Sequence, residues 1–393
     1  MSAIDILFIG KNAAEAKKKN PQVINATLGT FYDEDKKMII PFVKDKLMQI
    51  QVDNIFPYGT TSGGDIFKQN VLSWVFDQTK EEIESYFKTD VIATPGGSGA
   101  ISIAFNTYTN PLDSVLISDI KWRYDFFTKA AKINIEDFIL FENNTFNLNS
   151  FHQKLQKLTE QQKKVLVVIN DPCHNPTGYQ LNQNEWAEII NIMNQYHQND
   201  ITLLLDIAYF DYDPEGLEKS REKFLQLKKV LPHITPLIAF SASKSFSMYG
   251  LRLGALIGLF QTEQQADYFR KHAYEDALGK WSTAPSVGIE LFNEISKEKE
   301  TYKTVLSKIT NQLTQRGNLF IEEARKQNLN HYPFKGGFFV LIPVDDPLKC
   351  YEKLVKEEAL HVVPMKEGLR VALCSVTKDE IKQIVYKIKK TLS

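Results

Sequence analysis

The sequence predicts an α/β fold: a mostly parallel sheet domain covered by helices on both faces, with a second, smaller α+β domain formed by the two chain ends. Between about residues 90 and 260, short apolar runs rich in β-branched residues alternate with amphipathic helical patterns. Continuous apolar strands separated by helices are typical of a parallel sheet that is buried on both faces. After Pro285 the pattern changes to one long polar-faced helix and then to short strands and helices.

Six runs in the first region predict strands, because each is short, apolar and bounded by turn residues. These runs are Asp90–Ala93, Ser114–Ser118, Lys164–Asn170, Thr202–Asp206, Pro236–Phe240 and Ala255–Phe260. Between the third and fourth runs, Asn184–Tyr196 carries Trp186, Ile189, Ile190 and Met193 on one helical face. This spacing predicts a helix that packs on the sheet.

The C-terminal region predicts a smaller α+β domain. Its expected elements are a helix at about Lys297–Gln327, the segment Gly337–Pro343, a helix near Pro347–Ala359, strands at His361–Pro364 and Leu369–Leu373, and a helix from Thr377. The first forty-five residues are too few to fold alone, so we expect them to pack against this region. The predicted domains are 46–292, and 1–45 together with 293–393, with no repeat or flexible linker between them.

Composition restricts the class of protein. The chain has 393 residues and is 43% hydrophobic, which excludes a disordered tail or a small disulfide scaffold. Lys plus Arg is 47 against 48 Asp plus Glu, and this balance argues against nucleic acid as the main partner. The cysteines Cys173, Cys350 and Cys374 are odd in number and far apart, which fits a reducing compartment and predicts no metal site.

The N-terminal segment and the length of the apolar runs indicate the cellular compartment of the protein. Met1–Gly10 has no basic start before its short apolar stretch, so it does not resemble a signal peptide. The longest apolar runs are far shorter than the roughly 20 residues that a spanning helix needs. We therefore expect a cytoplasmic protein that has no membrane partner.

Ligands in open α/β sheets bind beyond the carboxyl ends of the strands, so residues after each strand are the site candidates. Thr94–Ala100 follows the first strand with three glycines and opens a helix, where backbone N–H groups can approach an anion. The segment lacks the Gly-Lys-Ser/Thr of a P-loop, and Ser102 stands where a dinucleotide fingerprint has a small Gly or Ala. A simple tight turn is the alternative.

Polar residues also follow the predicted strands Lys164–Asn170 and Thr202–Asp206. Asn170–Gly178 comes after one apolar strand, and Asp206 with Tyr209 comes after the next. A carboxylate is costly to bury unless it meets a positive partner, so Asp206 predicts a nearby cation from the protein or a ligand. A helix N-cap is the alternative for this aspartate.

Lys244 lies just after the predicted strand Pro236–Phe240 and has a serine on each side. Arg252 follows it, shortly before the next apolar strand. Most lysines are solvated surface residues, which is the alternative here. A lysine that is desolvated beside another cation has a lowered pKa, and its amine can then attack a carbonyl carbon.

Three motifs in this order carry a family resemblance: Asn175-Pro176-Thr177-Gly178, Asp206-x-x-Tyr209, and Ser241-x-Ser243-Lys244-x7-Arg252-x-Gly254. Together they resemble the pyridoxal-phosphate-dependent aminotransferases of fold type I, in particular the aspartate and aromatic aminotransferase group. The resemblance runs from about Asn25 to the last helix. It implies an enzyme that exchanges an amino group between an L-amino acid and a 2-oxo acid.

The resemblance also implies roles around pyridoxal phosphate. Lys244 would hold the cofactor as a Schiff base, Asp206 would pair with the protonated pyridine nitrogen, and Tyr209 and Asn175 would bond the phenolic oxygen. The phosphate would lie near Gly97, Ser98, Ser241 and Arg252, and Ser243 would also be a cofactor-binding residue. The catalytic set implied in this way is Lys244, Asp206 and Tyr209.

Other correspondences concern the ring face, the substrate and a second subunit. Trp122 resembles the tryptophan that stacks on the cofactor, with an ordinary core aromatic as the alternative. Arg370 resembles the arginine that clamps the substrate α-carboxylate, with a surface arginine as the alternative; Gly29, Trp122 and Asn175 join it as substrate contacts. Tyr58 resembles the tyrosine that reaches the cofactor phosphate of the neighbouring subunit, which implies a homodimer.

The chain departs from the family pattern at one position. Members that prefer dicarboxylates have a second arginine where this sequence has Leu278, so specificity for aspartate is not predicted. Lys280, Lys121 and Arg123 stay open as substitutes for that arginine.

Two other functions remain open at this point. A carbon–sulfur β-lyase of the same fold would share the cofactor-holding residues. An amino-acid sensor that binds the cofactor is the non-enzyme alternative, although the first forty-five residues are too short for the helix-turn-helix domain that such regulators usually carry.

Overall fold

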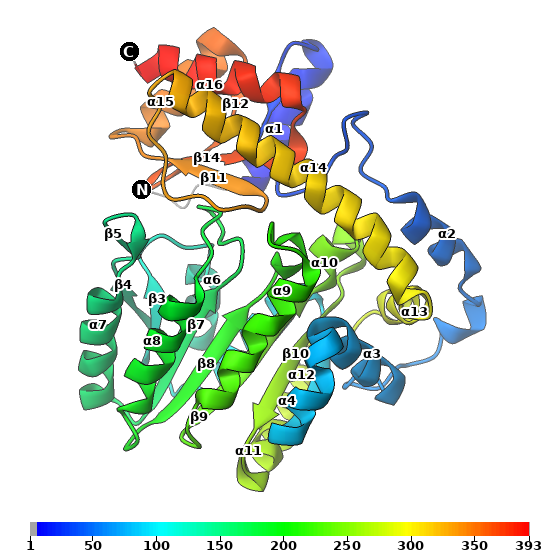
Figure 1. Ribbon diagram of the computed structural model, residues 1–393. Coiled ribbons are helices and arrows are strands. Elements are labelled where there is room, and N and C mark those ends of the chain that lie inside the picture. Colours follow the sequence, from blue (N-terminus) through cyan, green and yellow to red (C-terminus); the bar gives the residue numbers. More distant parts are fainter. Residues whose placement is uncertain (1–5, 393) are drawn as a thin grey trace.

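The computed structural model describes residues 6–392, and Figure 1 gives their arrangement. Residues 1–5 and 393 lie outside the described part, and so do the portions of the predicted small domain and of the Met1–Gly10 segment that fall on them. A large layered unit holds the central sheet, and a smaller unit that contains both ends of the described chain lies above it in Figure 1.

The central sheet has seven strands in the order β2-β10-β9-β8-β7-β3-β4 among the described residues. The strands are β2 (Lys88–Thr94), β3 (Ser114–Ser118), β4 (Asn134–Phe138), β7 (Lys164–Asn170), β8 (Asp200–Asp206), β9 (Ile234–Ser241) and β10 (Gly254–Phe260). All neighbouring strands are parallel except β10, which is antiparallel to both β2 and β9. The predicted fold class, a mostly parallel sheet with a smaller second unit, is confirmed.

The strand β10 runs antiparallel because of its connection to β9. Residues 242–253 hold only the one-turn helix α10 (Ala242–Ser245) and a 3-10 turn at Tyr249–Leu251. This is too little helix to carry the chain back along the sheet, which a parallel neighbour requires. The edge strand β4 was not predicted, because Glu136 and Asp137 interrupt its short apolar pattern.

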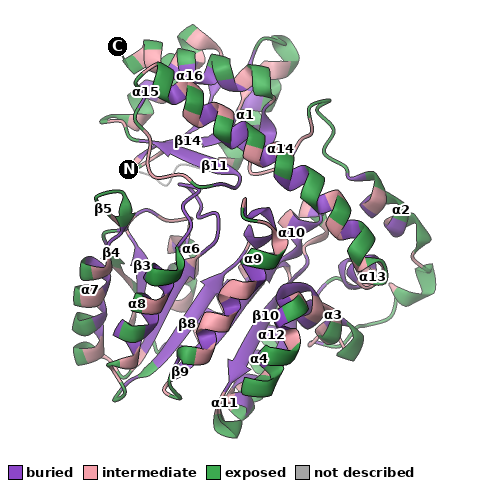
Figure 2. Cartoon of the chain, viewed as in Figure 1, coloured by how far each residue is buried: buried purple, intermediate pink, exposed green. Residues whose placement is uncertain are grey.

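Helices cover both faces of the sheet. One face packs against α5 (Gly96–Thr107), α6 (Asp125–Ala131), α11 (Glu263–Tyr268) and α12 (Tyr274–Trp281), and the other against α3 (Asp65–Phe76), α4 (Lys80–Tyr86), α7 (Leu148–Gln161), α8 (Gln183–Asn194) and α9 (Leu217–Glu222). Leu166 joins the apolar core of the first face, whereas its neighbours Val165 and Val167 join that of the second. Side chains therefore alternate between two buried layers, and Figure 2 shows buried strands beneath helices with exposed outer sides.

The smaller unit is built from both chain ends. Its elements are α1 (Ile6–Lys19), β1 (Ile24–Asn25), β11 (Phe339–Ile342), α15 (Pro347–Glu358), β12 (Leu360–His361), β13 (Val363–Met365), β14 (Gly368–Ala372) and α16 (Lys378–Leu392). β1 pairs in parallel with β12, so the N-terminal segment packs on the C-terminal one as we expected. The expected single strand His361–Pro364 is two strands, because Leu360–His361 pairs with β1 whereas Val363–Met365 pairs with β14.

Three further helices connect the two units. They are α2 (Pro41–Gln49), α13 (Ser286–Ser296) and α14 (Lys299–Lys326), which is the long helix that the sequence predicts. Figure 1 shows α14 running from the smaller unit down to the side of the larger one. The two-residue strands β5 (Phe141–Glu142) and β6 (Thr145–Phe146) form a separate hairpin. The residue boundaries of the two domains stay a prediction.

Neither a membrane-spanning helix nor a metal-binding cluster occurs in the described part of the chain. Across residues 6–392 no helix is long and apolar enough to cross a bilayer. The same residues contain no group of three or more His, Cys, Asp or Glu side chains placed to hold a metal ion.

Candidate active site

A cavity lies where the carboxyl ends of the parallel strands meet the turn after β2. Its lining comprises Gly97, Ser98, Ile101, Trp122, Asn170, Asn175, Asp206, Ala208, Tyr209, Ser241, Ser243, Lys244 and Arg252. Every residue that the resemblance assigns to the cofactor lines this cavity, except Tyr58. The strand order brings them together, because β7, β8 and β9 are adjacent and parallel and so end at the same edge.

Lys244 lies in the one-turn helix α10, with its amine 5.1 Å from the ring centre of Tyr249 and 5.9 Å from that of Tyr209. Its backbone carbonyl accepts a 2.5 Å hydrogen bond from the Tyr212 hydroxyl. Burial lowers the pKa of the Lys244 amine to about 8, and the positive charges of Arg252 and Arg370 contribute to the lowering. Lys244 is therefore no solvated surface lysine.

Asp206 is the last residue of β8 and is 5% exposed. Its Oδ2 accepts a 2.7 Å bond from the Tyr124 hydroxyl, and its Oδ1 accepts a 3.2 Å bond from the backbone N–H of Ala208. The Ala208 bond is a local turn contact and not a helix N-cap, because the next helical turn begins at Phe210 with Tyr209 at its N-cap position. No cation of the described chain forms an ion pair with this carboxylate, although the charge of Lys244 acts on it. Burial raises the pKa of Asp206, while these two bonds and the charge of Lys244 oppose that rise.

Asn175 is held in place by Asn170, a residue of the segment after β7 to which the sequence analysis gave no role. The side chain of Asn170 accepts a 2.8 Å bond from the backbone N–H of Asn175 and donates a 2.8 Å bond to the backbone carbonyl of Asp206. Asn170 therefore ties the loop after β7 to the end of β8. Its signal in the sequence was the same as that of Asp206, a polar residue at the end of an apolar strand.

Arg370 lies in β14 and is 3% exposed, so the surface alternative is wrong. Its guanidinium donates to Asn175 Oδ1 at 3.3 Å and to the carbonyl of Thr27 at 2.9 Å, and it lies 4.3 Å from the ring centre of Phe339. The Nε–H has no partner, and no carboxylate pairs with this arginine among the described residues. Burial lowers the pKa of Arg370 to about 10. A buried cation with a free donor fits an anionic ligand.

Arg252 lies opposite the glycine-rich turn. Its Nη1 donates to Ser243 Oγ and to the carbonyl of Tyr249, both at 3.0 Å. Gly96 has a φ of 73°, and a Cβ at this position would lie 2.3 Å from Arg252 Nη2. The segment is therefore a tight turn, as the alternative held, and also the start of the twelve-residue helix α5, whose first N–H groups can meet an anion.

The remaining predicted residues lie at different distances from the cavity. Trp122 lines it, with its ring edge-to-face against Tyr124 at 5.6 Å. Gly29 does not line the cavity; an added Cβ there would come 2.6 Å from Phe339 Cζ, and the Phe339 ring contacts Arg370. Tyr58 is 96% exposed and does not line the cavity of its own chain.

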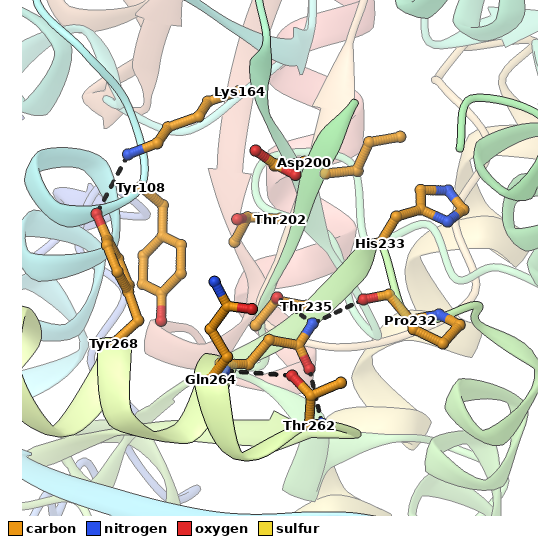
Figure 3. A pocket seen from close by; sticks show the side chains of 12 residues that line it. Tyr108, Lys164, Asp200, Thr202, Pro232, His233, Thr235, Thr262, Gln264 and Tyr268 are labelled. Carbon is orange, nitrogen blue, oxygen red and sulfur yellow. Dashed lines mark hydrogen bonds between the residues drawn. The ribbon is translucent and has the colours of Figure 1, made fainter. Parts of the chain in front are cut away.

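A second hollow of about 300 Å³ lies at the opposite edge of the sheet. Figure 3 shows Lys164 pointing toward Tyr268, to whose hydroxyl it donates at 3.2 Å. Gln265 donates to Thr235 Oγ1 and to the carbonyl of Pro232, both at 2.9 Å. The lining of this hollow includes no buried carboxylate beside a lysine of lowered pKa. The cavity around Lys244 is therefore the candidate active site.

A protein-family model described as aminotransferase class I and II matches residues 21–388. The chain belongs to this family. Its members depend on pyridoxal phosphate, so the family resemblance and the cofactor that the sequence predicted are confirmed.

Individual relatives agree with this assignment. An aromatic-amino-acid aminotransferase of Pseudomonas aeruginosa is 26% identical over 54% of this chain and 52% of its own, so that alignment spans about half of the relative. An aspartate aminotransferase of Sulfurisphaera tokodaii is 23% identical over 79% of this chain and 72% of its own. The solved structure of an aminotransferase from Anaerococcus prevotii has a TM-score of 0.93 and 27% identity, covering 99% of this chain and 97% of that one.

The residues of the cavity fit pyridoxal phosphate. The cofactor offers a ring nitrogen that can carry a positive charge, an aldehyde and a phosphate. The cavity offers a buried carboxylate without an ion pair at Asp206, an amine of lowered pKa at Lys244, and a guanidinium beside a helix start at Arg252. Each group of the cofactor thus meets a side chain of complementary chemistry.

Proposed function

We propose that this protein exchanges an amino group between an L-amino acid and a 2-oxo acid, with pyridoxal phosphate linked covalently to Lys244. The observation that carries the proposal is that two cations lie close to one another at this site. The Lys244 amine, which is partly buried and has a pKa of about 8, lines the cavity, and the buried Arg370 guanidinium bonds the lining residue Asn175 and has a free Nε–H. A lysine that would bind an aldehyde can exchange places there with the amino group of a substrate, and an anion clamp nearby suits the carboxylate of the same substrate.

Lys244 acts twice in this mechanism. Its amine would hold the cofactor and would be set free when the amino group of the substrate takes its place. Because its pKa is near 8, a useful fraction of the freed amine is neutral at pH 7 to 8 and accepts the proton from the substrate Cα. When bound, pyridoxal phosphate supplies an electron sink for the charge left at that carbon.

The other residues of the site hold the cofactor and orient the substrate. Asp206 would stabilise the positive ring nitrogen of the cofactor, Tyr209 and Asn175 would bond its phenolic oxygen, and Trp122 would pack against its ring. Gly97, Ser98, Ser241, Ser243 and Arg252 hold the phosphate. Arg370, with Gly29 close by, fixes the α-carboxylate, so that the Cα–H bond is directed at Lys244.

We also propose that neutral and aromatic donors are preferred to aspartate. Leu278 replaces the arginine that would bind a distal carboxylate. Each of the three substitutes has another carboxylate partner: Lys280 bonds Asp276 at 2.7 Å, Lys121 bonds Asp137 at 2.7 Å, and Arg123 bonds Asp125 at 3.3 Å. An unpaired distal carboxylate would cost about 1–3 kcal/mol or more.

The assembly and the compartment are part of the same proposal. Tyr58 is almost fully exposed. Three apolar residues before it in the chain are also exposed: Phe56 by 79%, Met48 by 77% and Val52 by 59%. Such a group of exposed apolar side chains suits a contact with a second copy of the chain, with Tyr58 reaching the neighbouring phosphate. The three cysteines are free and buried, which supports a cytoplasmic protein.

One experiment tests the reaction and ranks the donors. Absorbance scans of the purified holoenzyme follow addition of L-tyrosine, L-phenylalanine, L-methionine, L-alanine and L-aspartate in turn. We expect the cofactor band to convert with the aromatic donors faster than with aspartate, and the variant Lys244→Ala to lose turnover. Near-normal turnover of that variant contradicts the proposal, and pyruvate with ammonia released from cystathionine without an oxo acid would indicate a lyase.

A further inference from the structure

The hydrogen bond between Tyr124 and Asp206 carries a role that neither the motifs nor the family match assigns. We propose that Tyr124 is a positioning residue, which holds the Asp206 carboxylate ionised and oriented toward the cofactor ring. This proposal rests on the proposed function, because it assumes that Asp206 meets the ring nitrogen of pyridoxal phosphate.

The position of the Tyr124 hydroxyl is fixed by packing. Tyr124 is 1% exposed, and its ring stacks on Phe105 with centres 6.3 Å apart and planes at 27°. Its other ring contact in the site is Trp122, edge-to-face at 5.6 Å and 87°. Because the ring is held on two sides, the hydroxyl has one place to donate, which is Asp206 Oδ2 at 2.7 Å.

The bond also determines how the carboxylate is oriented. Oδ1 accepts from Ala208 N–H at 3.2 Å and Oδ2 accepts from Tyr124, so the two oxygens are fixed from different segments of the chain. Donors on both oxygens leave the carboxylate little freedom to rotate. A ring nitrogen can then approach a carboxylate that needs no rearrangement.

The bond finally opposes the effect of burial. Burial raises the pKa of Asp206, which favours the neutral acid, whereas a hydrogen bond donated to the carboxylate favours the charged form. Burial and the neighbouring Asp206 hold the pKa of Tyr124 well above its ordinary value, so the phenol keeps its proton and stays a donor. A charged Asp206 keeps the ring nitrogen protonated, which is the form that withdraws electrons.

The test compares Tyr124→Phe with a matched control. Tyr179→Phe also removes one phenol oxygen that bonds a carboxylate, Glu185 Oε1 at 2.6 Å, and Tyr179 is 5% exposed. The first readout is the equilibrium dissociation of pyridoxal phosphate from the holoenzyme. We expect Tyr124→Phe to weaken retention roughly ten- to hundred-fold, as the loss of a hydrogen bond to a charged group predicts, and Tyr179→Phe to leave it within about two-fold.

The second readout is the pH titration of the visible band of the bound cofactor. When the ring nitrogen is protonated to a smaller extent, the ring withdraws less electron density, and the group that titrates in the visible band becomes more basic. The midpoint of this titration should therefore move to higher pH in Tyr124→Phe and stay unchanged in Tyr179→Phe. The same dissociation constant and midpoint in both variants and in wild type would overturn the proposal. Failure of the wild-type protein to take up pyridoxal phosphate would instead overturn the proposed function.

A second substitution keeps the test valid if the phenylalanine variant does not fold. Replacing Tyr124 by 3,5-difluorotyrosine keeps the ring, its packing and its oxygen but makes the phenol a stronger acid. The titration midpoint should then differ from wild type, because the strength of the bond to Asp206 changes while the packing does not. An unchanged midpoint contradicts the proposal.

Discussion

At the scale of single residues, the candidate site holds buried charges that the protein does not neutralise. Arg370 has no carboxylate partner and Asp206 has no cation at ion-pair distance within residues 6–392. Leaving such groups buried and unpaired costs free energy, which binding of partners of opposite charge would offset. The site is therefore organised for its ligands rather than for the stability of the free protein.

The lowered pKa of Lys244 predicts how cofactor uptake depends on pH. Only the neutral amine attacks the aldehyde, so the rate of uptake by the cofactor-free protein should rise with pH, with a midpoint near 8, and level off above it. Stopped-flow absorbance between pH 6 and pH 10 measures this rate. A midpoint near 10.5, the ordinary lysine value, would contradict the prediction.

A second prediction at this scale concerns Arg370. The substitution Arg370→Lys keeps the charge but loses the planar pair of donors, so kcat/KM for amino-acid donors should fall roughly 10- to 100-fold. Steady-state kinetics with L-tyrosine measures the change. Arg325→Lys, on the exposed side of α14, is the matched control and should behave as wild type, and an equal effect of both substitutions would argue against carboxylate binding at Arg370.

At the scale of elements, the site depends on how closely β10 approaches the turn after β2. A Cβ on Gly254, the first residue of β10, would lie 2.4 Å from the backbone carbon of Gly96 and 2.6 Å from the carbonyl oxygen of Phe240. Backbone atoms on both sides cannot move as a flexible side chain can. The absent side chain at Gly254 thus allows the glycine-rich turn to lie beside the strand that precedes Lys244.

This contact predicts the effect of adding one methyl group. Gly254→Ala should destabilise the protein by about 1–3 kcal/mol, because the overpacked backbone must shift. Gly250→Ala is the control, since a Cβ at Gly250 would meet nothing within 4 Å. Thermal unfolding of both variants measures the difference, and equal melting temperatures would show that the turn tolerates the methyl group.

At the scale of the whole molecule, the substrate side of the site is assembled from both ends of the chain. The bond from Arg370 to the carbonyl of Thr27, the pairing of β1 with β12, and the bond from Phe31 N–H to the Tyr249 hydroxyl at 2.9 Å join the N-terminal segment to the C-terminal unit and to the large unit. The site therefore requires the two units to be docked together.

The proposed dimer gives a prediction at the same scale. If Tyr58 completes the neighbouring site, Lys244→Ala chains and Tyr58→Ala chains mixed by refolding should form heterodimers with one intact site. Activity should recover to about one quarter of wild type, since about half the dimers are mixed and each has one working site of two. Mixed samples that are no more active than the two variants measured separately would contradict shared sites.

The sequence by itself determined the fold class, the family and the cofactor, because these depend on strand periodicity and on motifs that are local in the chain. It also predicted that Asn175, Asp206 and Lys244 lie at one edge of the sheet, since polar residues after adjacent parallel strands meet there, and the family resemblance supplied other lining residues such as Trp122 and Ser243. Only the tertiary structure determined the antiparallel direction of β10, the burial of Arg370, and the hydrogen bonds of Asn170 and Tyr124. Hydrogen bonds such as Tyr124 to Asp206 join residues far apart in the chain, and their existence depends on packing and direction, which no local pattern records.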